Sequence, residues 1–99
     1  MRNTAFSSSG IQEHDEESIQ IWLVEQIART TGLKPDQIDI AQSFASYGID
    51  SVAAAGLAGE LSNWLGTQLA PTVTWDYPSV RLLAQYAAAI CPGHRALAA

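Results

Sequence analysis

Apolar residues recur at helical spacing in three segments of the chain. In the first, residues 16–31, Ile19, Leu23 and Ile27 stand four positions apart. Residues three or four positions apart share one face of an α-helix, so this stripe predicts an amphipathic helix. Acidic residues open the segment and Gly32 follows it, as is typical of the two ends of a helix.

The other two segments, residues 51–65 and 80–90, have the same character. The stripe of the second helix is assigned to Val52, Leu57, Leu61, Trp64 and Leu65. The third helix, with Ser79 as its expected N-cap, has one side formed by Val80, Leu83, Ala84, Ala87 and Ile90. No window shows the sustained alternation of a strand. We therefore expect an all-α fold, a small bundle of three main helices with one or two short helical turns.

The first connection, residues 33–50, is eighteen residues long. Loops of this length are uncommon in compact domains and are often functional or contain turns of their own. Pro35 followed by an aspartate predicts one short helical turn, and Phe44 and Tyr47 are expected to anchor the connection on the helices. A further turn is expected around residues 75–77.

Length and composition allow one small domain. The 99 residues, 47% of them apolar, can build a modest core. We expect the domain at residues 15–91, with flexible tails at 1–14 and 92–99. The net charge of −5 and the scattered basic residues argue against nucleic acid as a partner. No apolar run approaches the roughly 20 residues that span a bilayer, and no secretory signal is apparent, so we expect a cytoplasmic monomer.

Catalytic and metal chemistry find little support in the sequence. The two histidines, His14 and His94, are expected in opposite tails, so no metal site is predicted. Asp50 and Ser51 are adjacent, but a serine hydrolase would also need a histidine base. Cys91 is the single cysteine and is interpreted as a small apolar residue. We expect no catalysis by this chain alone.

Ser51 stands at the start of the second predicted helix. Serine and aspartate both favour the N-cap, a contribution of about 1 kcal/mol, so capping alone is the simplest interpretation. However, Asp50 can cap the helix and leave the Ser51 hydroxyl free. A helix N-terminus also favours a phosphate group. The long connection ahead of Ser51 is consistent with a loop that keeps Ser51 accessible.

Residues 47–61, YGIDSVAAAGLAGEL, resemble the phosphopantetheine attachment motif of acyl carrier proteins, commonly Gly-x-Asp-Ser-Leu. The resemblance extends over residues 16–90, and WDYPSVRLLAQYAA is most similar to carrier domains of modular polyketide synthases. It implies an acyl-carrier bundle that holds acyl or polyketide intermediates as thioesters on 4′-phosphopantetheine. Ser51 would accept that group from coenzyme A. Asp50 would be recognised by the phosphopantetheinyl transferase, whose own site would hold magnesium.

The resemblance also implies partners: an acyl-loading enzyme (an acyltransferase or acyl-AMP ligase) and a ketosynthase or other synthase domains. The expected docking residues lie on the second helix and just before it: Ile49, Val52, Ala53, Ala54 and Glu60. Ala53 and Ala54 are expected to be exposed, and Val52 replaces the usual leucine. Many carriers of bacterial fatty acid synthesis have a markedly acidic second helix, whereas this one has only Glu60 after Asp50. We therefore expect docking to be more hydrophobic and less sensitive to salt than in those carriers.

Two other interpretations stay open. Peptidyl carriers of nonribosomal peptide synthesis usually show Gly-Gly-His/Asp-Ser before the helix, whereas Ile49 follows Gly48 here. A helical protein-interaction module without a prosthetic group would use Ser51 only as a cap.

Overall fold

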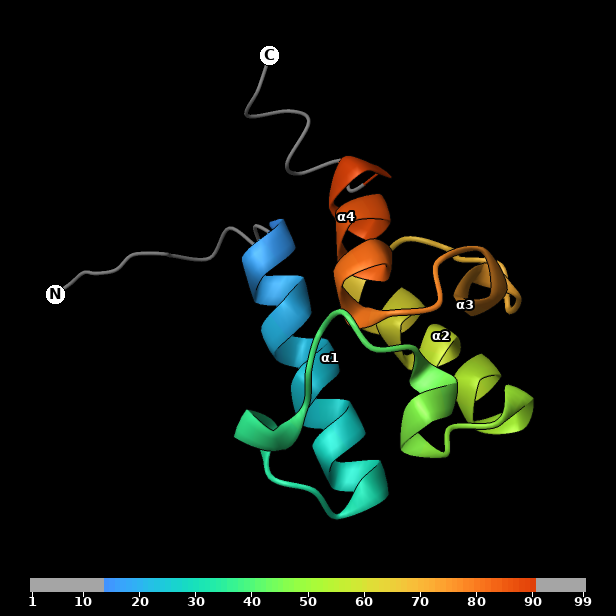
Figure 1. Ribbon diagram of the computed structural model, residues 1–99. Helices are drawn as coiled ribbons and strands as arrows, with labels where there is room; N and C mark the ends of the chain where they lie inside the picture. The colour runs from blue at the N-terminus through green and yellow to red at the C-terminus, as the bar shows by residue number, and fades with distance from the viewer. Residues whose placement is uncertain (1–13, 91–99) are drawn as a thin grey trace, which may run out of the picture.

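The computed structural model describes residues 14–90. All the regular secondary structure within them is helical (Figure 1). The α-helices are α1 (Glu16–Thr31), α2 (Ser51–Leu65), α3 (Val73–Asp76) and α4 (Val80–Ile90), and the 3₁₀ turns are η1 (Pro35–Gln37) and η2 (Phe44–Tyr47). The predicted all-α bundle with three main helices is confirmed. η2 is a second turn in the first connection, where we expected one. The predictions for Cys91, His94 and the tails, apart from His14, lie outside the described residues.

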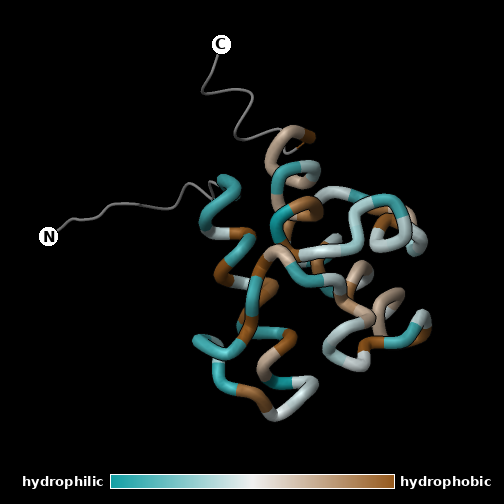
Figure 2. Tube along the Cα trace, viewed as in Figure 1, coloured by the Kyte–Doolittle hydropathy of each residue, from teal (hydrophilic) through white to brown (hydrophobic). Residues whose placement is uncertain are grey.

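The three long helices share one apolar core. α1 and α4 lie side by side and run in opposite directions (Figure 1). The predicted stripe of α1, Ile19, Leu23 and Ile27, is fully buried, as are Leu61 of α2 and Leu83 of α4. Along α1, apolar positions alternate with hydrophilic ones at helical spacing (Figure 2). Because each buried side chain of this size contributes roughly 1.5–3 kcal/mol, this cluster holds the bundle together.

The buried face of α2 differs from the predicted one at Val52, which is 80% exposed. The residues that turn inward are Ala54, Leu57, Ala58, Leu61 and Leu65. At 3.6 residues per turn, positions 52 and 54 lie roughly 200° apart around the helix. Burial of Ala54 therefore directs Val52 to the opposite side, into solvent.

The first connection is fastened to the turn between α3 and α4. The Phe44 amide donates a hydrogen bond of 2.8 Å to the Pro78 carbonyl. Beside it, Ser43 and Ser79 form an isolated antiparallel β-bridge. The Phe44 side chain is buried in the core, as the sequence predicted for an anchor. The segment ahead of α2 therefore has a fixed path.

Tyr47 closes the same connection on itself. Its hydroxyl accepts a hydrogen bond from the Asp39 amide at 2.6 Å, and it donates one of 3.1 Å to the Asp39 carbonyl. The ring is partly buried against the core. The partly buried ring fits the predicted anchor, whereas the two hydrogen bonds to Asp39 stay within the connection and do not reach a helix.

His14 belongs to the packed part of the chain, although the sequence placed it in the N-terminal tail. Its ring is buried and meets Trp64 edge-on, with 4.4 Å between the ring centroids. Trp64 in turn stacks on Trp22 at 5.2 Å, so the three rings join the start of α1 to α2. Burial lowers the pKa of His14 from its usual value, and the charge of Asp15 partly opposes this shift.

No helix among residues 14–90 is both long enough and apolar enough to cross a membrane.

Candidate functional site

Ser51 is the first residue of α2, and its side chain is exposed. The cap of the helix is Asp50, whose carboxylate accepts a hydrogen bond of 2.9 Å from the Ala53 amide. The Asp50 carbonyl accepts the first bond of the helix, from the Ala54 amide at 2.8 Å. Asp50 therefore accounts for the start of the helix, as predicted, and α2 does not need the Ser51 hydroxyl as its cap.

Gly48 sets the position at which α2 begins. It ends η2 with a φ of 79°, in the left-handed region that residues with a side chain disfavour. Its amide donates to the Ala45 carbonyl, which closes the turn. The chain then turns Ile49 inward, and Asp50 and Ser51 follow on the surface.

The surroundings of Ser51 suit a phosphate ester. The amides of the first helical residues, Ser51 and Val52, have no acceptor within the helix and lie at the positive end of its dipole. A phosphate esterified to the Ser51 hydroxyl therefore has hydrogen-bond donors and favourable charge beside it. No group of three or more His, Cys, Asp or Glu residues that could hold a metal ion occurs within the described part of the chain.

A cavity of about 330 Å³ opens beside Ser51. Its walls come from η2, the start of α2, and α3 with the residues after it, and its lining includes Phe44, Ala54 and Trp75. Thr74, on the α3 side, is 4% exposed, and its hydroxyl has no hydrogen-bond partner among residues 14–90. Thr74 was not predicted from the sequence, because one threonine in a short turn forms no pattern.

The residues predicted to dock partners do not all lie on one exposed surface. Val52 and Glu60 are exposed, and Ala53 is half-buried. Ile49 and Ala54 are only 7% and 6% exposed. The expectation that these two offer an accessible surface is wrong, because Ile49 turns toward α1 after Gly48 and Ala54 lies on the core face of α2.

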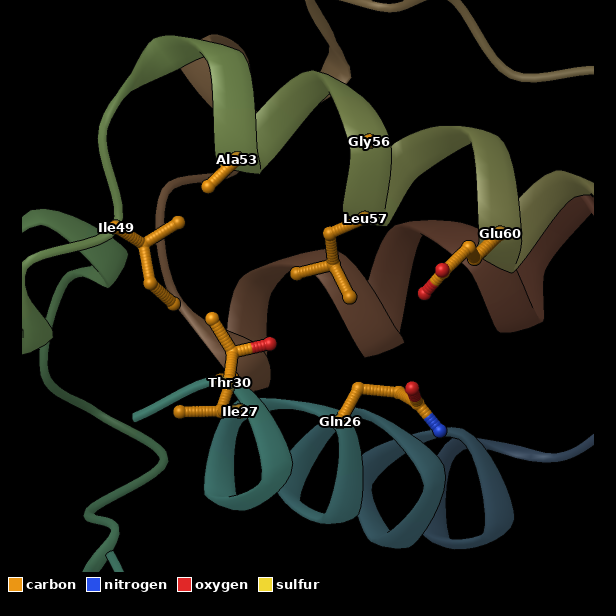
Figure 3. Close-up of a pocket in the computed structure, with 8 residues that line it drawn as sticks. All are labelled: Gln26, Ile27, Thr30, Ile49, Ala53, Gly56, Leu57 and Glu60. Carbon is orange, nitrogen blue, oxygen red and sulfur yellow. The ribbon is translucent and has the colours of Figure 1, made fainter. Parts of the chain in front are cut away.

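A groove of about 190 Å³ between α1 and α2 shows where Ile49 goes (Figure 3). Ile49 and Leu57 point from the α2 side toward Ile27 of α1, while Glu60 and Gln26 lie toward the other end of the groove. Ile49 therefore belongs to the contact between helices, and Glu60 lies at the edge of that contact.

Comparison with known proteins identifies this arrangement. Residues 21–87 match the family described as the phosphopantetheine attachment site. Acyl carrier protein TtuC of Teredinibacter turnerae is 34% identical over 73 residues, which are 74% of this chain and 84% of TtuC. A phenolphthiocerol/phthiocerol polyketide synthase of Mycobacterium tuberculosis is 36% identical over 74 residues, 75% of this chain. The chain spans only 4% of the length of that synthase.

Two solved structures agree with this result. The solution structure of Asl1650, an acyl carrier protein of Anabaena sp. PCC 7120 with a variant phosphopantetheinylation-site sequence, is 34% identical with a TM-score of 0.75, covering 88% of this chain and 99% of Asl1650. The crystal structure of a free-standing peptidyl carrier protein of Acinetobacter baumannii is also 34% identical, with a TM-score of 0.69 and coverage of 74% and 91%. These matches define the class of this chain as a carrier domain.

The chain belongs to the phosphopantetheine-binding family, as an acyl carrier protein. The group that this family carries is covalently bound 4′-phosphopantetheine, so the expected cofactor is confirmed. Members of the family are generally carriers that other enzymes act on.

Proposed function

We propose that Ser51 carries the phosphopantetheine group and that the protein presents acyl or polyketide intermediates on it as thioesters. The observation that supports this most strongly is the division between Asp50, which caps α2, and Ser51, which stays exposed at the positive end of the same helix. The prosthetic group supplies a thiol, whose pKa of about 8.5 makes a thiolate accessible near neutral pH, as the serine hydroxyl does not.

Attachment requires a phosphopantetheinyl transferase, with magnesium in the site of that enzyme. The Ser51 hydroxyl attacks the phosphorus of coenzyme A that bears the pantetheine, and a phosphodiester forms. The bond to the second phosphate breaks, adenosine 3′,5′-bisphosphate leaves, and the transferase takes up the hydroxyl proton. This chain contributes the exposed oxygen of Ser51 and the amides at the α2 N-terminus, which stabilise the anionic ester.

A polyketide-type pathway fits the relatives best. Both a polyketide synthase and a separate acyl carrier protein match most of this chain. The partners are then an acyltransferase or acyl-AMP ligase that loads the arm, and a ketosynthase or other synthase domains. A peptidyl carrier is the second candidate, since one such structure shares the fold at 34% identity. Ile49 between Gly48 and Asp50 favours the acyl carrier.

Mass spectrometry tests the attachment residue. The protein is incubated with a broad-specificity phosphopantetheinyl transferase, coenzyme A and magnesium. We expect the wild type to gain the mass of one phosphopantetheine and Ser51→Ala to gain none, with unchanged helicity and thermal midpoint. A folded wild type that gains no mass would contradict the proposal. Loading the modified protein with malonyl or acetyl groups rather than amino acids then separates the acyl carrier from the peptidyl carrier.

Asp50→Asn tests a separate expectation, that the transferase recognises Asp50. The amide oxygen of asparagine can still accept from the Ala53 amide, so α2 keeps its cap, while the carboxylate charge is lost. Slower modification with an unchanged unfolding free energy supports recognition of Asp50 by the transferase. An unchanged rate of modification would mean that Asp50 only caps α2.

A further inference from the structure

The first connection contains a loop, residues 39–47, that the side chain of Tyr47 closes. The Tyr47 hydroxyl accepts a hydrogen bond from the Asp39 amide at 2.6 Å and donates one of 3.1 Å to the Asp39 carbonyl. The same carbonyl accepts a bond of 3.1 Å from the Gln42 amide, so Asp39 joins a tight turn to the end of η2. Because the Tyr47 ring packs against the core, its hydroxyl has a fixed position.

Two backbone hydrogen bonds hold this loop beside the start of α4. The Arg81 amide donates to the Ile40 carbonyl at 3.0 Å, and the Phe44 amide donates to the Pro78 carbonyl at 2.8 Å. Both bonds lie before the last residues of η2. The hydroxyl of Tyr47 extends this attachment to the last residue of η2, from which the chain turns toward α2.

We propose that Tyr47 is a positioning residue, whose hydroxyl keeps the chain ahead of Ser51 in a path that leaves this serine open to the phosphopantetheinyl transferase. This inference rests on the proposed attachment at Ser51. Tyr47 stands four positions before Ser51, and residues 43–45 and 49–51 line one cavity. The segment that Tyr47 restrains is therefore the wall beside the serine. Its path decides how much room an enzyme has at the Ser51 hydroxyl.

The contacts that do not involve Tyr47 limit the effect to this segment. Ile49 is buried and Asp50 caps α2, so the serine itself stays in place when the tyrosine hydroxyl is lost. Residues 45–48 instead become free to take several paths, since Gly48 has no side chain to restrict its backbone. An enzyme that binds only one of these paths has its apparent affinity reduced by the fraction of chains in that path. Once the chain is bound it is in the productive path, so the rate at saturation does not change.

Transferase kinetics on two variants test this role. Tyr47→Phe removes the hydroxyl and keeps the ring against the core, whereas Tyr86→Phe makes the same chemical change at a half-buried tyrosine of α4. After circular dichroism has confirmed that both variants fold, each is titrated as the substrate, and its rate of mass gain is measured. We expect the KM of Tyr47→Phe to rise about fivefold with kcat unchanged, because one hydrogen-bonded contact is lost. Tyr86→Phe should match the wild type.

NMR order parameters of the backbone amides show whether the change is local. In Tyr47→Phe, the order parameters of residues 45–48 should fall, because the loop is no longer closed at its end. Those of α1 should stay at the wild-type values. In Tyr86→Phe, both sets should be unchanged. A general loss of stability would not produce this pattern together with a change in KM alone.

An unchanged KM for Tyr47→Phe would overturn the positioning role and leave attachment at Ser51 standing. An equal rise in KM for Tyr86→Phe, or a rise for Tyr47→Phe without lower order parameters at residues 45–48, would overturn it as well. A folded wild type that gains no mass would instead overturn the proposed function, and this inference with it.

Discussion

At the start of α2, two neighbouring polar side chains have separate tasks. Asp50 bonds the Ala53 amide and fixes the helix end, whereas Ser51 remains on the surface. Since successive residues point about 100° apart around a helix, changing one of them leaves the contacts of the other in place. For this reason Ser51→Ala should remove the proposed attachment point without unfolding the protein.

His14 predicts a pH dependence of stability. Burial lowers its pKa in the folded protein below the value of about 6.5 expected in the unfolded chain, although Asp15 partly opposes the shift. Below that pH the unfolded chain binds a proton more readily, so this group favours unfolding as the pH falls toward the folded-state pKa. Above about pH 6.5 the His14 ring is neutral in both the folded and the unfolded state, so its contribution to the pH dependence of stability vanishes.

Urea denaturation of His14→Phe checks this prediction. Phenylalanine keeps a ring against Trp64 and does not titrate. We expect the wild type to lose more unfolding free energy between pH 7 and 5 than the variant does, because only the wild type has a buried ionisable ring at position 14. Equal losses would mean that His14 is not protonated differently in the two states.

At the scale of single residues, a role was predictable where its interaction partner is close in the sequence, and not predictable where the partner is distant. The capping role of Asp50 was predictable, because its partner stands three residues on. The burial of His14 was not, because it depends on Trp64, fifty positions later in the numbering. The lack of a partner for the Thr74 hydroxyl among residues 14–90 likewise depends on what the fold brings around it.

Among the elements, α1 was the easiest to predict and the inner face of α2 the hardest. In α1, Ile19, Leu23 and Ile27 recur at four-residue spacing, so the stripe of large apolar residues has one orientation. In residues 52–58 of α2, valine, alanines, glycine and leucine are apolar or small on every side. The pattern therefore does not choose between Val52 and Ala54, and packing against the core made the choice.

Replacing each of two glycines with alanine should change the unfolding free energy in opposite directions. Gly48→Ala places a side chain at a φ of 79° and should lower the unfolding free energy by about 1–2 kcal/mol. Gly56→Ala lies inside α2, where the added methyl would meet no heavy atom within 4 Å, and should raise it by about 0.5–1 kcal/mol. Chemical denaturation of both variants measures the difference. Destabilisation by both would show that α2 does not tolerate a side chain at position 56.

On the scale of the whole molecule, large apolar side chains are exposed near Ser51. Val52 is exposed on α2, and Trp75 is 69% exposed on α3, which lines the same cavity as Ser51. Glu60 is the one acidic residue within α2. An isolated exposed apolar residue is ordinary, but two large ones beside the proposed attachment residue favour contact with partners.

Docking should therefore depend on apolar contacts and respond weakly to salt. We expect Trp75→Ala to lower the kcat/KM of a partner enzyme about tenfold, or about 1.4 kcal/mol, with Val52→Ala in the same direction. Raising the salt concentration should change the wild-type value little. Ile21→Ala is the control, since Ile21 is also exposed but lies on α1. A steep fall in kcat/KM with salt, or an equal effect of Ile21→Ala, would contradict apolar docking at Trp75 and Val52.

The overall architecture was more predictable than the cavity. Helical spacing indicated the three long helices, and the resemblance at residues 47–61 indicated their family. The cavity beside Ser51 is built from η2, α2 and α3, and η2 was not expected. Its shape depends on contacts between residues 43–44 and 78–79, which no local pattern encodes.

Those contacts have a consequence for the order in which the site forms. The bond from Phe44 to Pro78, with the bridge from Ser43 to Ser79, joins positions that ribosomal synthesis makes well apart in time. Until Ser79 has left the ribosome, the segment ahead of Ser51 lacks its partner and the wall containing Thr74 is unattached. Closing so long a stretch of chain also costs entropy before any contact offsets it. The site around Ser51 therefore reaches its final shape only after nearly all of residues 14–90 have been made and folded.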